Sequence, residues 1–439
     1  MEETPHVVTR KGIQAEGTAV GSVFTLVNAA VGAGVVSFPY AFSKTGVLLG
    51  AVLTLLFAVL TVSTVNVLTK ATIRTNSTTY SQLAETTLGK PFSLVVSLFL
   101  LLNQLGACIA YMMIVGGTVE TIASVYGAAG SVFTSRKFAI TASSLLVLLP
   151  LSLPKTMGAV AAVSSLSSFS LIYMCVAMMI RGLPSLFDHT EMSKIKLVSF
   201  EDLINVIPVM VFAFMCHVQA PTVAAELSDE TSFFKKKNED DRLSTRDRIK
   251  LMAKINAVSS GIVMIGYALI GEFGYISFGP LTDSNILKNY PQKDVLMNLC
   301  RVAIAIVSLS SFPININPGK GALDHIVCTI MKWPIDPLTT SRHLTETLCL
   351  FFISLSVALS VQDLGTVFEI IGGSAGALLA FMCPSFMTMT STYRERTEYI
   401  PLSDGETAPE MSRLGTRLKA ALFMLIGLFM FGHTIASHL

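Results

Sequence analysis

The apolar stretch at residues 27–40, VNAAVGAGVVSFPY, is interrupted where a membrane helix should be continuous. Gly32 and Gly34 lie at its middle, and Pro39 follows. A spanning helix needs about 20 apolar residues. In hydrocarbon each unpaired backbone N–H or C=O is costly, so a broken helix is tolerated only where it is buried or lines a cavity. Residues 31–34 are therefore expected to expose backbone polar groups near mid-membrane.

Such a break offers two kinds of binding chemistry. The N–H groups that begin the second half-helix carry partial positive charge, which suits an anion such as a carboxylate. The carbonyls that end the first half-helix suit a small hard cation. Because transporters place substrate and ion sites at discontinuous helices, the stretch predicts a binding site of that type.

A second break is predicted within residues 205–226, NVIPVMVFAFMCHVQAPTVAAE. Pro208 and Pro221 bracket the segment 212–217. Proline removes a backbone donor and disfavours helix in the residue before it. The two breaks lie five predicted spans apart, as two inverted five-helix repeats with a site between them would require.

The composition indicates a membrane protein. Of the 439 residues, 52% are hydrophobic and only 14% are charged, against about 25% charged residues in soluble domains. The mean hydropathy is +0.63, and the alternating pattern of membrane β-strands is not found. We expect an all-α integral membrane protein, and the net charge of +2 gives no sign of a nucleic-acid partner.

The apolar runs predict about eleven transmembrane helices. A short tail, residues 1–17, precedes a ten-helix core at 18–388, with repeats at 18–181 and 203–388, and residues 389–439 form a cytosolic loop and the eleventh helix. Lys and Arg gather in the loops on the side of the N-terminus, which predicts a cytosolic N-terminus and an exoplasmic C-terminus. The expected spans are 18–44, 47–70, 93–125, 137–154, 158–181, 203–226, 251–279, 296–331, 344–361, 363–388 and 415–436.

Hydroxyl side chains in the eighth span suggest a cation site. Ser310 and Ser311, beside carbonyls of the first span, would supply the oxygen ligands that sodium prefers, although such hydroxyls often bond only to their own helix. The interior of the fifth span has no lysine that could replace a bound ion. Lys320 is expected to snorkel or pair and has no assigned transport role. His217 is either a pH-sensitive group or a neutral imidazole that satisfies freed backbone groups.

Other polar residues inside the spans allow weaker assignments. Tyr111, with Asn103 and Gln104 in the same span, is the best placed to face the cavity, and a packed core tyrosine is the alternative. Glu272 and Glu369 fall towards the exoplasmic ends of their spans and receive no role.

With these motifs the chain resembles the amino acid/auxin permease family, most closely the sodium-coupled neutral amino acid transporters and their glutamine and asparagine carriers. The resemblance covers nearly the whole chain. The stretches that carry it are residues 21–34 with Phe38-Pro39, 106–111, 136–154, 212–217 and 274–279. Within 136–154 the resemblance lies in the RKF at the start and the LPLSLP at the end.

The resemblance implies the leucine-transporter fold of the APC superfamily, with two inverted repeats plus an eleventh helix. It also implies a site for an amino acid's carboxylate at Gly32, Ala33 and Gly34. The sodium site of that fold would use Asn28 and Val31 in the first span and hydroxyls of the eighth. One eighth-span position that is often threonine in the family is serine here. The implied sodium ligands are Asn28, Val31, Ser310 and Ser311.

The resulting hypothesis is secondary active transport of neutral amino acids with glutamine-like side chains, coupled to sodium, by alternating access. The substrate ammonium would meet backbone carbonyls freed in the sixth span. Proton-driven export from a lysosome or vacuole, with a role for His217, is the alternative, and an amino-acid sensor ranks below it. No enzymatic motif was found. The sequence leaves the membrane open between plasma membrane and lysosome or vacuole, and it does not indicate the oligomeric state. The carbonyls assigned to the ammonium are those of Phe212, Ala213, Phe214 and Met215.

Overall fold

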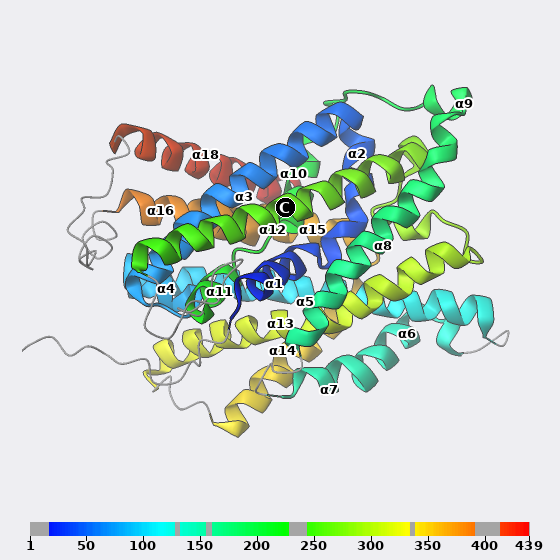
Figure 1. Cartoon of the computed structure of the whole chain (residues 1–439). Coiled ribbons are helices and arrows are strands. Elements are labelled where there is room, and N and C mark those ends of the chain that lie inside the picture. The colour runs from blue at the N-terminus through cyan, green and yellow to red at the C-terminus, as the bar shows by residue number, and fades with distance from the viewer. Residues whose placement is uncertain are drawn as a thin grey trace, which may run out of the picture.

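The computed structural model describes residues 17–127, 132–154, 160–227, 244–333, 339–390 and 413–438. Nearly all of the expected N-terminal tail and most of the loop that follows residue 389 lie outside these residues. The described chain is almost entirely helical. In Figure 1 the long helices run side by side across the molecule, and α1 lies in the middle of the bundle.

The helices begin and end close to the expected spans. They are α1 (Ala19–Val31), α2 (Phe38–Thr45), α3 (Val47–Thr75), α4 (Tyr80–Leu88), α5 (Lys90–Tyr126), α6 (Arg136–Ser143), α7 (Leu149–Ser152), α8 (Val160–Leu186), α9 (His189–Met192), α10 (Leu203–Ala213), α11 (Ala220–Glu226), α12 (Thr245–Phe278), α13 (Val295–Met331), α14 (Thr340–Ser360), α15 (Leu364–Ile371), α16 (Cys383–Met389) and α18 (Arg413–His438). Short 3-10 or π segments are η1 (Ala33–Ser37), η2 (Val132–Thr134), η3 (Ser144–Leu148), η4 (Gly279–Leu281), η5 (Ile286–Lys288), η6 (Gly372–Gly376) and η7 (Leu378–Met382).

Within the described residues, eight helices are long and apolar enough to cross a membrane, or nine if the bent pair at the first break counts as one span. Two expected spans fall outside that criterion. One is divided into α6, η3 and α7, and the other contains only the short helix α10. The predicted number of eleven therefore stays a prediction. The short helices α4 and α9 were not expected from the sequence.

The first break lies where the glycines predict it. Helix α1 ends at Val31, and η1 begins at Ala33. Between them Gly32 has φ −25° and ψ −135°, outside the helical region. The two halves of the span, Ala19–Val31 and Ala33–Thr45, are bent by 46°.

The second break is also confirmed, a few residues later than the prolines suggested. Pro208 lies inside α10, which continues to Ala213. Pro221 occupies the first turn of α11, where proline fits because that N–H has no helical partner. The non-helical segment is therefore 214–219.

The bundle packs around these two breaks. Helix α13 packs mainly on α5, and α12 packs on α3 and α8. Helix α1 lies against α12 and α8, while α10 lies against α15 and η6. Because α1 and α10 are enclosed by other helices, their unpaired backbone groups face protein and not lipid, as a broken membrane helix requires.

Candidate functional site

The two helix breaks meet, and Tyr267 of α12 joins them. Its buried hydroxyl lies 2.6 Å from the carbonyl oxygen of Ala30 and 3.0 Å from that of Ala213. Both carbonyls are in the last turn of a helix, where no helical N–H remains to pair with them. The hydroxyl has one proton, so the two carbonyls share it, and one side chain of a third helix bridges both breaks.

The glycines of the first break allow this close approach. A Cβ atom on Gly34 would lie 2.7 Å from both Cα and Cβ of Ala213. A Cβ atom on Gly32 would lie 2.5 Å from the hydroxyl oxygen of Tyr111. The backbone of η1 can therefore touch α10 on one side and the Tyr111 hydroxyl on the other only because both positions lack a side chain.

Aromatic rings surround the same point. Phe38 stacks on Tyr267 with ring centroids 4.1 Å apart, and Phe214 contacts both rings edge-on, at 6.0 and 5.3 Å. The other two large side chains of the second break point elsewhere. Phe212 stacks on Phe368 of α15 at 4.6 Å, and Met215 reaches η6.

The carbonyls of the second break are partly engaged. The Phe212 carbonyl accepts a hydrogen bond from Met215 N (3.1 Å), and the Phe214 carbonyl accepts one from Cys216 N (2.9 Å). That of Ala213 accepts from Tyr267. Each carbonyl has a second lone pair, so these bonds leave acceptor capacity at the break.

Two of the expected cation ligands are brought together from opposite halves of the chain. Ser311 Oγ donates to Asn28 Oδ1 at 3.2 Å, and each residue is 1% exposed. Ser310, next to Ser311 on α13, donates its hydroxyl to the Val307 carbonyl at 2.8 Å, which is the local bond that serine commonly makes within a helix.

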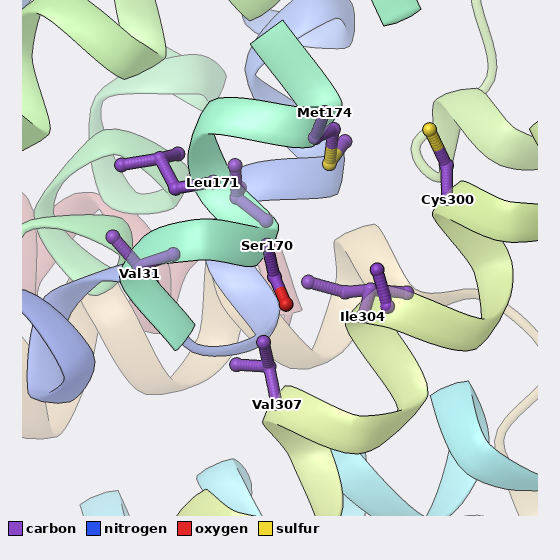
Figure 2. Close-up of a pocket in the computed structure, with 9 residues that line it drawn as sticks. Val31, Ser170, Leu171, Met174, Cys300, Ile304 and Val307 are labelled. Atoms are coloured by element: carbon purple, nitrogen blue, oxygen red, sulfur yellow. The ribbon is translucent and has the colours of Figure 1, made fainter. Parts of the chain in front are cut away.

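A small cavity lies beside Val31, between α1, α8 and α13. Figure 2 shows Val31, Leu171 and Met174 on one side, Ile304 and Val307 on the other, and the Ser170 hydroxyl directed between them. Its volume of about 10 Å³ is close to the minimum for one water molecule. The lining is mostly apolar, so this cavity by itself does not resemble an ion site.

Access to the breaks differs between the two ends of the bundle. At the end where α5 finishes and α13 begins, a cavity of about 570 Å³ reaches inwards to Val36 and Ile304. We call this cavity the vestibule. Its charged lining residues are Glu120, Arg136, Lys137, Lys288 and Arg301.

The opposite end is closed by contacts at the start of α1. Gly17 N donates to the Glu226 carbonyl at 3.1 Å, which ties the chain before α1 to the end of α11. Arg248 of α12 reaches the carbonyls of Ala224 (3.3 Å) and Leu227 (3.2 Å). Among the described residues, the vestibule therefore lies at one end of the bundle and these contacts at the start of α1 lie at the other.

Of the remaining intramembrane residues, His217 lies within the segment of the second break, 214–219, and Lys320, Glu272 and Glu369 lie on helices. His217 is 2% exposed and its Nε2 lies 2.8 Å from Thr64 Oγ1, while its Nδ1 has no hydrogen-bond partner within the described chain. Of the two expectations for Lys320, to snorkel or to pair, the first does not hold, because the residue is only 4% exposed. Glu369 of α15 lies 3.9 Å from Nε2 of His438 in α18, and Glu272 lies on α12.

Sequence reasoning missed the residues that link the junction together. Tyr267 was not singled out, although a tyrosine in an apolar span needs a partner for its hydroxyl. Asn315 was given no role either, yet its Nδ2 lies 3.2 Å from the Tyr111 hydroxyl. Gln219 was overlooked beside Pro221, and its Nε2 lies 3.2 Å from Asn315 Oδ1.

The sequence profile of the family described as transmembrane amino acid transporter protein matches residues 15–400. The chain belongs to this family. Similar relatives include sodium-coupled neutral amino acid transporter 7 of Rattus norvegicus, 27% identical, and of Homo sapiens, 26% identical, each aligned over 96% of this chain and 87% of its own length. Solute carrier family 38 member 10 of Homo sapiens is 27% identical over 84% of this chain and 32% of its own length.

Solved structures of distant sequence share the fold. MhsT in complex with L-phenylalanine superposes with a TM-score of 0.61 at 13% identity, covering 95% of this chain and 99% of its own. A manganese transporter of Eremococcus coleocola gives a TM-score of 0.64 at 12% identity, covering 99% and 90%. The predicted leucine-transporter fold is thereby confirmed, and this member of the amino acid transporter family is a transporter, not an enzyme.

Proposed function

We propose that the chain is a secondary active transporter of neutral amino acids with glutamine-like side chains, coupled to sodium, that works by alternating access. The observation that carries this proposal is the junction of the two helix breaks, held by the hydroxyl of Tyr267. A zwitterionic amino acid needs an anion site and a cation site a few ångströms apart, and two facing breaks offer both.

The substrate carboxylate binds the backbone N–H groups at the first break, at Gly32, Ala33 and Gly34. The start of η1 supplies N–H groups that are not used by a preceding helical turn. What supports the assignment is that any side chain at positions 32 or 34 would meet Tyr111 or Ala213. The Tyr111 hydroxyl, which lies against Gly32, adds a neutral hydrogen-bond donor for the same carboxylate.

The substrate ammonium binds carbonyls of the second break, in the segment from Phe212 to Met215. An ammonium has three donors and no acceptor, so it matches a cluster of carbonyl oxygens. The short distance between Gly34 and Ala213 supports a single substrate that touches both breaks. Phe214 and Phe38 would then cover the bound molecule with apolar surface.

Sodium binds between α1 and α13, with Asn28, the Val31 carbonyl, Ser310 and Ser311 as ligands. Sodium is a hard cation that prefers oxygen, and each of these positions offers an oxygen atom. The contact between Ser311 and Asn28 supports this site. So does the similarity to relatives named sodium-coupled neutral amino acid transporter 7.

Alternating access would open the two ends of the bundle in turn. The vestibule would be the exoplasmic route, and the contact between Gly17 and Glu226 would close the cytosolic route. This orientation assumes the cytosolic N-terminus inferred from the loop charges. It also assumes two repeats, at 18–181 and 203–388. The broken helix of the first repeat would begin with α1, and that of the second with α10. The membrane would be the plasma membrane or that of a lysosome or vacuole.

The test is uptake of labelled glutamine into proteoliposomes with an imposed sodium gradient or an imposed pH gradient. Accumulation driven by sodium and lost in Ser311→Ala is expected. Ser308→Ala is the matched control, because Ser308 is equally buried on α13 and, within the described chain, its hydroxyl bonds only to the Ile304 carbonyl, at 2.8 Å. Glutamine accumulation driven by protons alone would contradict the sodium site.

The rival function is proton-coupled export of amino acids from an acidic organelle. It is favoured by one observation, the buried Nδ1 of His217 without a hydrogen-bond partner in the described part of the chain. Under this rival, His217→Gln would abolish uptake driven by a pH gradient. Under the sodium mechanism, the same variant would keep most of its sodium-driven uptake.

A further inference from the structure

Four charged side chains meet inside the bundle where α13 packs against α14 (Figure 1). Each helix contributes an acid and a base four residues apart, a spacing that places both on one face of a helix. Lys320 and Asp324 belong to α13, and Arg342 and Glu346 belong to α14. We call these four side chains the charge cluster. Ionisable groups at membrane depth need partners, and they indicate a functional site by default.

The burial of the charge cluster is nearly complete. Lys320 is 4% exposed, Asp324 is 6% exposed and Glu346 is 7% exposed. A buried charge without a partner is costly, because it has lost its water and gained nothing in exchange. The contacts within the cluster therefore indicate which of its groups are charged.

Arg342 and Asp324 form an ion pair. Arg342 Nε lies 2.7 Å from Asp324 Oδ1, and Arg342 Nη2 donates to Asp324 Oδ2 at 3.2 Å. Both oxygens of this carboxyl therefore face one guanidinium group, and this two-point contact favours an ionised carboxylate. Cys328 adds a weak donor, with its Sγ 3.6 Å from Asp324 Oδ1. Asp324 is therefore the acid of the cluster that keeps its negative charge.

Glu346 is held differently. Its carboxyl lies within hydrogen-bonding reach of the Asp324 carboxyl, while its Oε2 has no hydrogen-bond partner within the described residues. Two ionised carboxylates cannot bond to each other, because each offers only acceptors, and at this distance they repel. A proton on one of them turns the contact into a hydrogen bond. Since Arg342 keeps Asp324 ionised, the proton belongs on Glu346.

Lys320 offers Glu346 a second partner. The Nζ of Lys320 has no hydrogen-bond partner in the described part of the chain, and it lies close enough to Glu346 for their charges to attract. With Glu346 ionised, the charge cluster carries no net charge; with Glu346 protonated, it carries one net positive charge. Asp324 therefore favours a proton on Glu346 and Lys320 opposes it, so the proton can be held reversibly.

The other ionisable groups on the surrounding helices face away from Glu346. His343 of α14 reaches the carbonyl that follows α7, and His325 of α13 reaches α4 and α5. Arg136 and Lys137, at the start of α6, line the vestibule at the other end of α14. On α5, Cys108 lies near the ammonium of the cluster.

We propose that Glu346 is a proton-binding site. With the proton bound, its carboxyl donates to the Asp324 carboxylate. When the proton leaves to water, the carboxylate turns to the Lys320 ammonium instead. A metal ion is disfavoured as the ligand, because Lys320 and Arg342 already bring two positive charges. The proposal goes beyond the proposed function and does not depend on it: Lys320 lies nine residues beyond Ser311 on α13, or about 14 Å along the helix.

Infrared difference spectroscopy of the full chain in lipid nanodiscs tests the site, because a protonated carboxyl has a C=O stretching band that a carboxylate lacks. Spectra are recorded from about pH 5 to about pH 9 for wild type, Glu346→Gln and the control Glu201→Gln. Glutamine keeps the length of the side chain and donates to Asp324 as the protonated acid does. Glu201 is the control because its side chain is 79% exposed. We expect a band that fades as the pH rises and that is missing only in Glu346→Gln.

Lys320→Met tests the second partner. Without the ammonium, the ionised Glu346 loses its counter-charge, so the band should persist to a pH about one unit higher. A titrating band that is equally strong in Glu346→Gln, or no titrating band in the wild type, would overturn the proton site. A band that fades at the wild-type pH in Lys320→Met would overturn the exchange of partners. The spectra need no substrate, so wild-type protein that accumulates no amino acid would overturn the proposed function and leave the proton site standing.

Discussion

Gly34 provides the sharpest perturbation of the junction. Ideal Cβ contacts lie at roughly 3.4–4 Å, whereas a Cβ at position 34 would be 2.7 Å from two atoms of Ala213. One of these is a backbone atom, so the clash cannot be relieved by a rotamer change alone. The first break and α10 must move apart by several tenths of an ångström or more.

The free-energy cost of this movement predicts how far the transport rate falls. Inserting a methyl group into a packed site costs about 1–3 kcal/mol. If that strain falls on the substrate-binding conformation, kcat/KM for glutamine uptake should fall by roughly 5- to 150-fold in Gly34→Ala. Gly34→Leu should abolish uptake.

The assay is the initial rate of glutamine uptake in proteoliposomes. Each rate is divided by the amount of folded protein, measured as the fraction that stays monodisperse after heating. Gly261→Ala is the matched control, because a Cβ there meets nothing within 4 Å on α12, and alanine favours a helix by up to about 1 kcal/mol over glycine. Gly34→Ala combined with Ala213→Gly should recover part of the activity, since one of the two clashing atoms is removed. Wild-type kcat/KM in both Gly34→Ala and Gly34→Leu would refute the close contact of the two breaks.

Three further outcomes follow from named contacts. Tyr267→Phe leaves the carbonyls of Ala30 and Ala213 without their shared donor, so thermal stability should fall by about 1–3 kcal/mol; unchanged stability would mean that the hydroxyl does not join the breaks. Tyr111→Phe should raise the KM for glutamine about tenfold with little loss of stability, and an unaltered KM would separate Tyr111 from the carboxylate. The chain has a glycosylation sequon at Asn76-Ser77-Thr78, directly after α3 ends at Thr75. It should carry no glycan when expressed in mammalian cells, because this side is predicted to be cytosolic; a shift in mass on deglycosylation would reverse the orientation.

The expected helix boundaries were close because they depend on local properties. Long apolar runs can only be helices in a membrane, and α3, α5 and α13 begin and end within a few residues of their predicted spans. The break after Val31 was also predicted from its glycines. The second break was displaced, because membrane helices tolerate proline and Pro208 lies inside α10 without ending it.

Partners across the fold were not predictable in the same way. The contact of Ser311 with Asn28 joins residues 283 positions apart, and nothing in either local sequence selects the other. Tyr267 and Gln219 were missed for the same reason, since a tyrosine or glutamine in an apolar span indicates that a polar partner exists but not which one. Lys320 was expected to snorkel or to pair, and only its neighbours in the fold decide between the two.

The sequence by itself therefore determined a helical membrane protein with two breaks at glycine and proline, since backbone chemistry in hydrocarbon is decided within one helix. Only the tertiary structure decided that the two breaks touch through Gly34 and Ala213, that Tyr267 bridges them, and that Asn315 links Tyr111 to Gln219 beside them. Those facts depend on the packing of α1, α10, α12 and α13 against one another. The periodicity of a single apolar helix does not encode which of its faces meets which neighbour.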